Sequence, residues 1–164
     1  MKIVVMGVSG CGKTSAAEQL AAHLALNFLD ADDFHNKANV AKMRAGIALT
    51  DADRADWLSI LNHQLRQHSA VALACSALKR DHRDQLRANN PGLMFLYLQG
   101  SMALIWQRMQ SRSEHYFNDQ GLLQNQFDTL EEPGPDEAIR VNIDTTLDEV
   151  VRQCLAQLPI SKEP

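Results

Sequence analysis

The sequence predicts an α/β fold, with a five-stranded parallel sheet flanked by helices. Short apolar runs suited to buried strands alternate along the chain with stretches in which apolar residues recur at helical spacing. A glycine-rich turn joins the first of these runs to the first helical stretch. The 164 residues contain no internal repeat, linker or low-complexity tract, and this length suits one hydrophobic core. We therefore expect a single domain over residues 1–164.

The first strand and the first helix lie on either side of that turn. Residues 3–6 are all apolar, as in a strand buried on both faces. After the turn, alanine and leucine, which are strong helix formers, recur at helical spacing. These residues are Ala16, Ala17, Leu20, Ala21 and Leu24.

Four further apolar runs predict the remaining strands, at residues 27–29, 71–75, 93–98 and 139–143. Apolar stripes at helical spacing predict helices through residues 57–65, 102–109 and 147–158. Thr50 or Asp51 could begin the first of these helices, because both side chains accept hydrogen bonds from helix N-terminal amides. Two prolines and a glycine at 133–135 break the pattern before the last strand.

The composition excludes several classes of protein. The chain is 45% hydrophobic and 22% charged, which is ordinary for a globular protein. Its net charge of −4 does not indicate a surface that binds nucleic acid. No apolar run has the length of a membrane span, and we expect no signal peptide before the first strand. The three cysteines are odd in number and widely spaced, which predicts a reduced cytoplasmic protein without a disulfide framework.

The glycine-rich turn fits the motif G-x-x-x-x-G-K-[ST] at every fixed position. Glycines let the backbone wrap around an anion, and the loop amides and the helix N-terminus can point at phosphates. Lys13 can then reach the β- and γ-phosphates, while the Thr14 hydroxyl can bind Mg²⁺. The alternative is a glycine-rich turn with a stray lysine. The predicted nucleotide-binding residues are Gly7, Val8, Ser9, Gly10, Cys11, Gly12, Lys13 and Thr14.

Ligands of open parallel sheets bind beyond the carboxyl ends of the strands. Asp30, Asp32 and Asp33 follow the second strand at this position. One carboxylate could hold a metal-bound water and another could accept a substrate proton. Alternatively, Asp32 or Asp33 caps the helix that follows. His35 could be a ligand or could pack on the loop.

Three basic positions admit both a binding and a surface interpretation. Arg54 lies among acids, where it could clamp a substrate carboxylate or form a surface ion pair. Lys79 and Arg83 follow the third strand, where they could bind substrate or belong to a solvated basic helix.

Arg108 and Arg112 are four residues apart and so share a helix face. They precede a polar stretch, 113–121, that we interpret as a lid. Arginines at the base of a lid could close over transferring phosphates. The alternative is an exposed helix with two unpaired arginines.

Two motifs of other nucleotide-binding classes are missing. Residues 36–39 approach the guanine-reading Asn-Lys-x-Asp sequence but lack its aspartate, and no apolar strand ends in an Asp-Glu pair. A short chain with a phosphate loop and a lid favours a P-loop kinase fold and a small-molecule kinase that uses ATP and Mg²⁺.

Several stretches together resemble the gluconokinases, P-loop kinases related to shikimate kinase. The specific elements are Asp30-Ala-Asp-Asp-Phe-His35, Ser76-Ala-Leu-Lys79 and Leu130-Glu-Glu-Pro133. With the phosphate loop and the stretches 39–46, 49–54, 57–58, 83–84, 115–117 and 126–133, they span nearly the whole chain.

The resemblance implies ATP-dependent phosphorylation of the 6-hydroxyl of D-gluconate, giving 6-phospho-D-gluconate, with a lid after the fourth strand. It implies that Asp32 meets the substrate hydroxyl, that Asp30 joins the Mg²⁺ shell and that Arg54 binds the sugar acid. Arg108 would lie near the nucleotide, with Arg112 beside it. We add His35, Lys79, Arg83 and His115 as substrate-binding candidates. The resemblance also implies a homodimer.

Two competing functions stay open: another small-molecule kinase, such as one for shikimate or a nucleotide, and a non-catalytic ATP-binding module. A nucleotide acceptor would need a second base-binding surface, which the sequence does not reveal. A non-catalytic module would tolerate loss of the acids after the second strand, and this chain keeps them.

Overall fold

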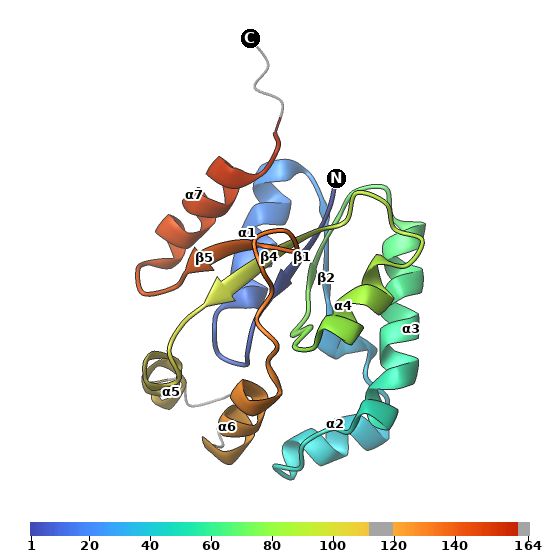
Figure 1. Ribbon diagram of the computed structural model, residues 1–164, viewed down its shortest axis with the longest axis vertical. Coiled ribbons are helices and arrows are strands. Elements are labelled where there is room, and N and C mark those ends of the chain that lie inside the picture. The colour runs from blue at the N-terminus through green and yellow to red at the C-terminus, as the bar shows by residue number, and fades with distance from the viewer. Residues whose placement is uncertain (112–119, 161–164) are drawn as a thin grey trace.

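Five parallel strands form a single sheet with helices on both faces, as Figure 1 shows. The structure, a computed structural model, describes residues 1–111 and 120–160. The strand order is β2-β3-β1-β4-β5, so β1 is central and pairs with β3 on one side and β4 on the other. The predicted fold class is confirmed.

The strands lie within one residue of the predicted bounds. They are β1 (Lys2–Met6), β2 (Asn27–Asp30), β3 (Val71–Ala74), β4 (Met94–Gln99) and β5 (Ile139–Asn142). The helices are α1 (Lys13–Leu24), the short 3₁₀ helix η1 (Ala31–Phe34), α2 (Lys37–Arg44), α3 (Asp51–Gln67), α4 (Arg80–Arg87), α5 (Met102–Gln110), α6 (Gln120–Thr129) and α7 (Leu147–Gln157).

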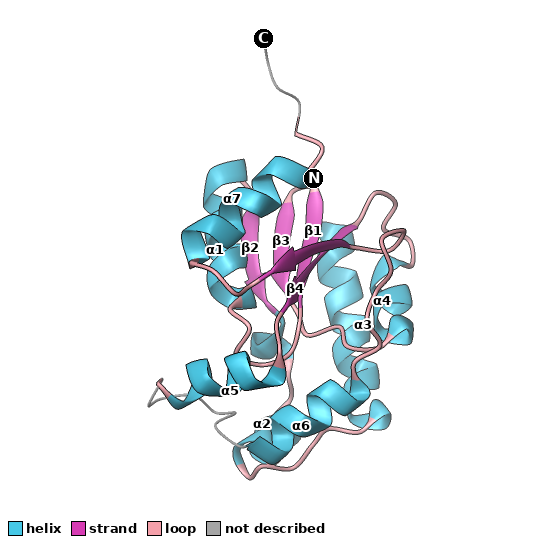
Figure 2. Ribbon diagram, turned by 60° about the vertical axis from the view of Figure 1, so that its left-hand side comes forward, coloured by secondary structure: helices cyan, strands magenta, loops and turns pink. Residues whose placement is uncertain are grey.

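The side chains of β1 alternate between two buried layers. Ile3 and Val5 pack in the layer that also receives α1, α5 and α7, whereas Val4 and Met6 pack with apolar residues of α3. Figure 2 shows α1 and α7 on one side of the sheet and α3 on the other. Burial of both faces explains why the strands appear in the sequence as continuous apolar runs.

Helix α3 begins at one of the two positions that the sequence predicted. The Thr50 hydroxyl accepts a hydrogen bond from the Asp53 amide at 3.1 Å, and an Asp53 carboxylate oxygen accepts one from the Thr50 amide at 2.9 Å. This reciprocal capping box fixes the start of α3. Thr50, one of the two predicted starts, is therefore the N-cap.

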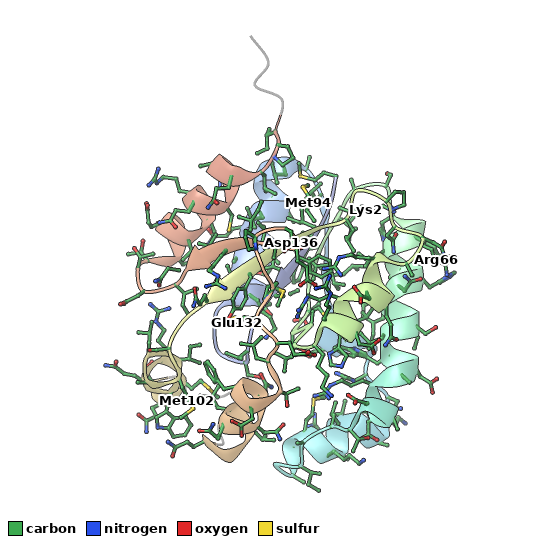
Figure 3. The ribbon with its side chains drawn as sticks, in the orientation of Figure 1. Lys2, Arg66, Met94, Met102, Glu132 and Asp136 are labelled. Atoms are coloured by element: carbon green, nitrogen blue, oxygen red, sulfur yellow. The ribbon has the colours of Figure 1, made fainter. Side chains whose placement is uncertain are left out.

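The sequence did not predict α6, which begins at Gln120 inside the predicted lid, 113–121. Most of that lid lies outside the described residues, as do Arg112 and His115. Figure 3 labels Glu132 on the segment that returns from α6 to β5, and its Oε1 accepts a hydrogen bond from the Tyr97 hydroxyl at 2.9 Å. This contact ties the returning segment to β4.

No helix in the described ranges, 1–111 and 120–160, is both long and apolar enough to cross a membrane.

Candidate active site

A pocket of about 480 Å³ opens at the carboxyl edge of the sheet. The phosphate loop, the turn after β2, the connection between α2 and α3, and α6 all contribute to its wall. Its lining residues are Ser9, Gly10, Gly12, Lys13, Thr14, Ser15, Asp30, Asp32, Asp33, His35, Met43, Ile47, Ala48, Leu49, Arg54, Trp57, Ser76, Leu122, Asn125 and Gln126.

The phosphate loop has three glycines of positive φ, Gly7, Gly10 and Gly12. Gly10 has φ +79°, and a Cβ there would lie 2.6 Å from Cγ of Met109 on α5. Gly12 has φ +91° and is the N-cap of α1. In the described part of the chain no side chain caps α1, and its first turn has no acidic residue. Its amides can therefore bind an anion.

Thr14 and Asp30 bring two oxygen ligands together. The Thr14 hydroxyl donates a hydrogen bond to Oδ2 of Asp30 over 3.4 Å, and both residues line the pocket. Hydroxyl and carboxylate oxygens suit Mg²⁺, which proteins hold through one or two such groups plus substrate phosphates. The described residues contain no cluster of three or more His, Cys, Asp or Glu that could hold a metal ion alone. The donor set fits Mg²⁺ bound together with a nucleotide.

Asp30 also caps the turn that follows β2. Its Oδ1 accepts a hydrogen bond from the Asp32 amide at 2.9 Å, and η1 begins at the next residue, Ala31. The capping alternative for Asp32 or Asp33 is therefore wrong, because Asp30 caps η1 and Asn36 caps the next helix, α2. The side chains of Asp32 and Asp33 line the pocket instead.

Arg54 also lines the pocket, from the start of α3. Its guanidinium donates to the Leu49 carbonyl at 3.0 Å. The neighbouring acids bind other cations: Asp51 accepts hydrogen bonds from Lys79, and Asp53 from Lys42. The described residues thus show no hydrogen-bonded ion pair for Arg54, which leaves its charge directed at the pocket that it lines.

His35 lines the same pocket as the aspartates and Arg54. Its ring stacks on Trp57, with the ring centroids 4.2 Å apart and the planes 13° from parallel. Burial, and to a smaller extent the nearby Arg54 charge, lower the pKa of His35 to about 4. The imidazole is therefore neutral at physiological pH.

Gln126 of α6 reaches across to the phosphate loop. Its Oε1 accepts a hydrogen bond from the Ser9 amide at 2.6 Å, and its Nε2 donates to the Ser9 hydroxyl at 2.8 Å. Sequence reasoning missed Gln126, together with Leu122 and Asn125 in the same wall. Only the inclusion of 126–133 in the family resemblance pointed to this helix.

Arg83 does not lie in the pocket wall, contrary to its assignment as a substrate-binding candidate. Its side chain is 1% exposed and donates to Glu137 at 2.6 Å. It also donates to the carbonyls of Ala77, Leu78 and Glu131. Arg83 therefore binds three loop carbonyls and a carboxylate inside the protein. The solvated-helix alternative is also wrong for this residue.

Lys79 and Arg108 likewise lie outside the pocket lining. Lys79 binds the Asp51 carboxylate at 3.0 Å, beside the first turn of α3. The Arg108 guanidinium donates to the carbonyls of Ile143 and Thr145 at 2.7 and 3.2 Å, which joins α5 to the end of β5. Neither contact brings these side chains to the phosphate loop in the described conformation.

Known proteins share both the sequence and the fold. The chain is 44% identical over 154 residues to the thermoresistant gluconokinase of Escherichia coli strain K12, covering 90% of this chain and 87% of that protein. The chain belongs to the gluconokinase family. A family model described as shikimate kinase also matches, over residues 9–159.

Solved structures agree with this family assignment. A gluconokinase from Sinorhizobium meliloti 1021 superposes with a TM-score of 0.89 at 43% identity, covering 94% of this chain and 89% of that one. A shikimate kinase from Aquifex aeolicus superposes with a TM-score of 0.64 at 15% identity and covers 95% of each chain. The second likeness concerns the fold alone. Gluconokinases thus share the P-loop kinase architecture seen here.

Proposed function

We propose that this protein catalyses the ATP-dependent phosphorylation of D-gluconate at the 6-hydroxyl, giving 6-phospho-D-gluconate and ADP. The observation that carries the proposal is one pocket that the phosphate loop, the Thr14–Asp30 pair, Asp32 and Arg54 line together. Such a pocket offers separate places for a triphosphate, a reacting hydroxyl and a carboxylate. Membership of the gluconokinase family supports the choice of acceptor.

The donor half of the reaction uses the loop and the start of α1. Lys13 lines the pocket, and its ammonium can move from its position 3.5 Å from the Val8 carbonyl to the phosphates. The loop amides hold the phosphate oxygens and keep the γ-phosphorus in place. Thr14 and Asp30 would hold Mg²⁺, which when bound offsets the negative charge of the phosphates.

The acceptor half uses Asp32 and Arg54. Arg54 binds the substrate carboxylate through its fork of N–H groups, which sets the direction of the extended chain. Asp32 accepts a hydrogen bond from the terminal hydroxyl and aims its oxygen at the γ-phosphorus. A bond forms between that oxygen and phosphorus, the bond from phosphorus to the β,γ-bridging oxygen breaks, and the hydroxyl proton passes to the Asp32 carboxylate.

An ADP-release assay over a panel of acceptors tests the proposal. The panel contains D-gluconate, other sugar acids, shikimate and nucleoside monophosphates, and we expect gluconate to give the highest kcat/KM. Preference for shikimate or a nucleotide would reject the proposed acceptor. Absence of turnover with every acceptor would instead favour a non-catalytic ATP-binding module.

Lys13→Ala provides the matched control for this assay. Lys13 supplies the charge that binds the phosphates, so the variant should lose turnover while its circular dichroism and thermal unfolding stay those of the wild type. Full activity in a folded Lys13→Ala protein would contradict the assignment of the phosphate site.

A cytoplasmic homodimer completes the proposal. In the described part of the chain the three cysteines are buried and no disulfide joins them, as in a protein of a reducing compartment, and the dimer rests on the family resemblance. Light scattering during size-exclusion chromatography should give twice the mass of the 164-residue chain. A monomer mass at micromolar concentration would reject the dimer.

A further inference from the structure

Asn39 fixes which nitrogen of His35 carries the proton. Asn39 is only 3% exposed, and its side-chain Nδ2 donates a hydrogen bond to the backbone carbonyl of Asp53 at 2.8 Å. A carbonyl can only accept, so this contact identifies the amide nitrogen and rules out the flipped orientation. The same Nδ2 lies 3.4 Å from Nδ1 of His35. Its second proton therefore points to Nδ1, which must accept.

A neutral imidazole that accepts through Nδ1 carries its proton on Nε2. Within the described part of the chain, Nε2 of His35 has no hydrogen-bond partner, and the residue lines the pocket. The N–H on Nε2 is thus available to donate a hydrogen bond to a ligand in the pocket.

Trp57 holds the ring in place. The Trp57 indole N–H donates to the Ala31 carbonyl at 2.7 Å, and Trp57 is 4% exposed, so the indole cannot turn without breaking a buried hydrogen bond. His35 stacks flat on this indole. The stack sets the plane of the imidazole while Asn39 sets its rotation within that plane.

We propose that His35 donates a hydrogen bond from Nε2 to a hydroxyl oxygen of the acceptor, and that Asn39 is the positioning residue that fixes this tautomer. The proposal rests on the function proposed above and deepens it, because it names how the pocket recognises the polyol part of its substrate. The charged Arg54 suits a carboxylate, whereas a neutral N–H suits a hydroxyl. Burial beside Arg54 keeps the ring from becoming an imidazolium.

Two substitutions of His35 distinguish the nitrogens. The amide nitrogen of glutamine can take the place of Nε2, whereas the shorter asparagine reaches only the position of Nδ1. His35→Gln should therefore keep the KM for gluconate within about threefold of the wild type. His35→Asn should raise it by roughly three- to tenfold, the effect of one lost neutral hydrogen bond. The KM for ATP should not change in either variant. Equal values of the gluconate KM in the two variants would overturn the proposal.

Nitrogen-15 NMR of the imidazoles measures the tautomer without any turnover. The chain has six histidines, and the resonance lost in His35→Gln assigns His35. We expect a protonated Nε2 and an unprotonated Nδ1 in the wild type, and a mixture of tautomers in Asn39→Ala. A protonated Nδ1 in the wild type, or an unchanged spectrum in a folded Asn39→Ala protein, would overturn the role of Asn39. If the proposed function itself were wrong, the wild-type protein would not phosphorylate gluconate. That outcome is distinct from the outcomes that test Asn39 and His35.

Discussion

Two aspartates that lie two residues apart have different surroundings and hence different proposed roles. Asp30 divides its oxygens between the Thr14 hydroxyl and the Asp32 amide, which places it beside the phosphate loop. The Asp32 side chain lines the pocket that also contains Arg54. The first position suits a metal ligand and the second suits a group that meets the acceptor. Substitution by asparagine separates the two roles, because it keeps the shape and removes the charge.

Asp32→Asn should lower kcat by roughly 10²–10⁴-fold, the usual range for loss of a positioned general base. The KM for ATP should change little, because the phosphate loop stays intact. Steady-state kinetics with saturating gluconate measure both values. Asp33→Asn is the matched control from the next position in the same wall, and we expect a smaller loss of kcat. A near-normal kcat in Asp32→Asn would move the role to Asp33.

Asp30→Asn should act through the metal. A neutral amide binds Mg²⁺ more weakly than a carboxylate does, so the concentration of Mg²⁺ that gives half-maximal rate should rise. Titration of Mg²⁺ at a fixed ATP concentration measures this requirement. If the requirement stayed at the wild-type value while kcat fell, Asp30 would not be a metal ligand.

At the scale of elements, α6 and the phosphate loop are joined by one side chain. The Gln126 side-chain amide forms two hydrogen bonds with Ser9, one with its backbone amide and one with its hydroxyl, although Ser9 lies 117 positions earlier in the sequence. This contact holds α6 over the pocket and fixes the third residue of the loop.

Gln126→Leu should therefore raise the KM for ATP by roughly tenfold, which corresponds to the loss of one or two hydrogen bonds. The matched control is Gln124→Leu, since Gln124 lies on the same helix but bonds the exposed Asp128. We expect the control to keep the wild-type KM. Equal effects in both variants would show that α6 tolerates neither change for reasons of folding, and would contradict a specific link to the loop.

The sequence predicted those elements and residues whose signal is local. The strands are continuous apolar runs, and Gly7–Thr14 is a contiguous motif between a strand and a helix. The role of Arg83 could not be predicted from the neighbouring sequence. Its partner Glu137 lies 54 positions away, and only the fold brings the two residues together. A basic residue after a strand has the same sequence signature whether it faces a ligand or a buried carboxylate. Gln126 was missed for the same reason.

At the scale of the whole molecule, Arg83 and Glu137 connect the α4 region with the segment that leads to β5. Arg87 also binds Glu137, and its guanidinium lies 4.7 Å from the centroid of the Phe95 ring. The side chains of Arg83 and Glu137 are 1% and 6% exposed. A buried charge pair of this kind loses far more when one partner is removed than an exposed pair does.

Arg83→Met should lower the free energy of unfolding by about 3 kcal/mol, since Glu137 then keeps only Arg87. Urea denaturation followed by circular dichroism measures the change. Arg152→Met is the matched control, because Arg152 forms an exposed pair with Glu149 at the protein surface, and it should change the unfolding midpoint little. A loss in Arg83→Met no larger than in the control would contradict a buried structural role.

The same network predicts how stability depends on pH. Burial raises the pKa of Glu137, but the hydrogen bonds and charges of Arg83 and Arg87 outweigh burial and lower it below its ordinary 4.5. A depressed folded-state pKa contributes stability above 4.5 that is lost as the pH falls through the folded value. Urea midpoints measured between pH 7 and pH 3 should therefore fall less steeply in Glu137→Gln than in the wild type. If the urea midpoints of the two proteins fell equally between pH 7 and pH 3, Glu137 would not contribute to the pH dependence of stability.

All five strands run in one direction, so the candidate active-site pocket lies at one edge of the sheet and the amino ends of the strands lie at the other. Met1 lies at that far edge, where its ammonium is 3.5 Å from the Ser69 carbonyl, and α7 ends on the same side (Figure 1). A fusion partner or surface tether attached at residue 1 would extend away from the pocket. The catalyst could then be immobilised on a solid support with the mouth of its pocket open to the solution.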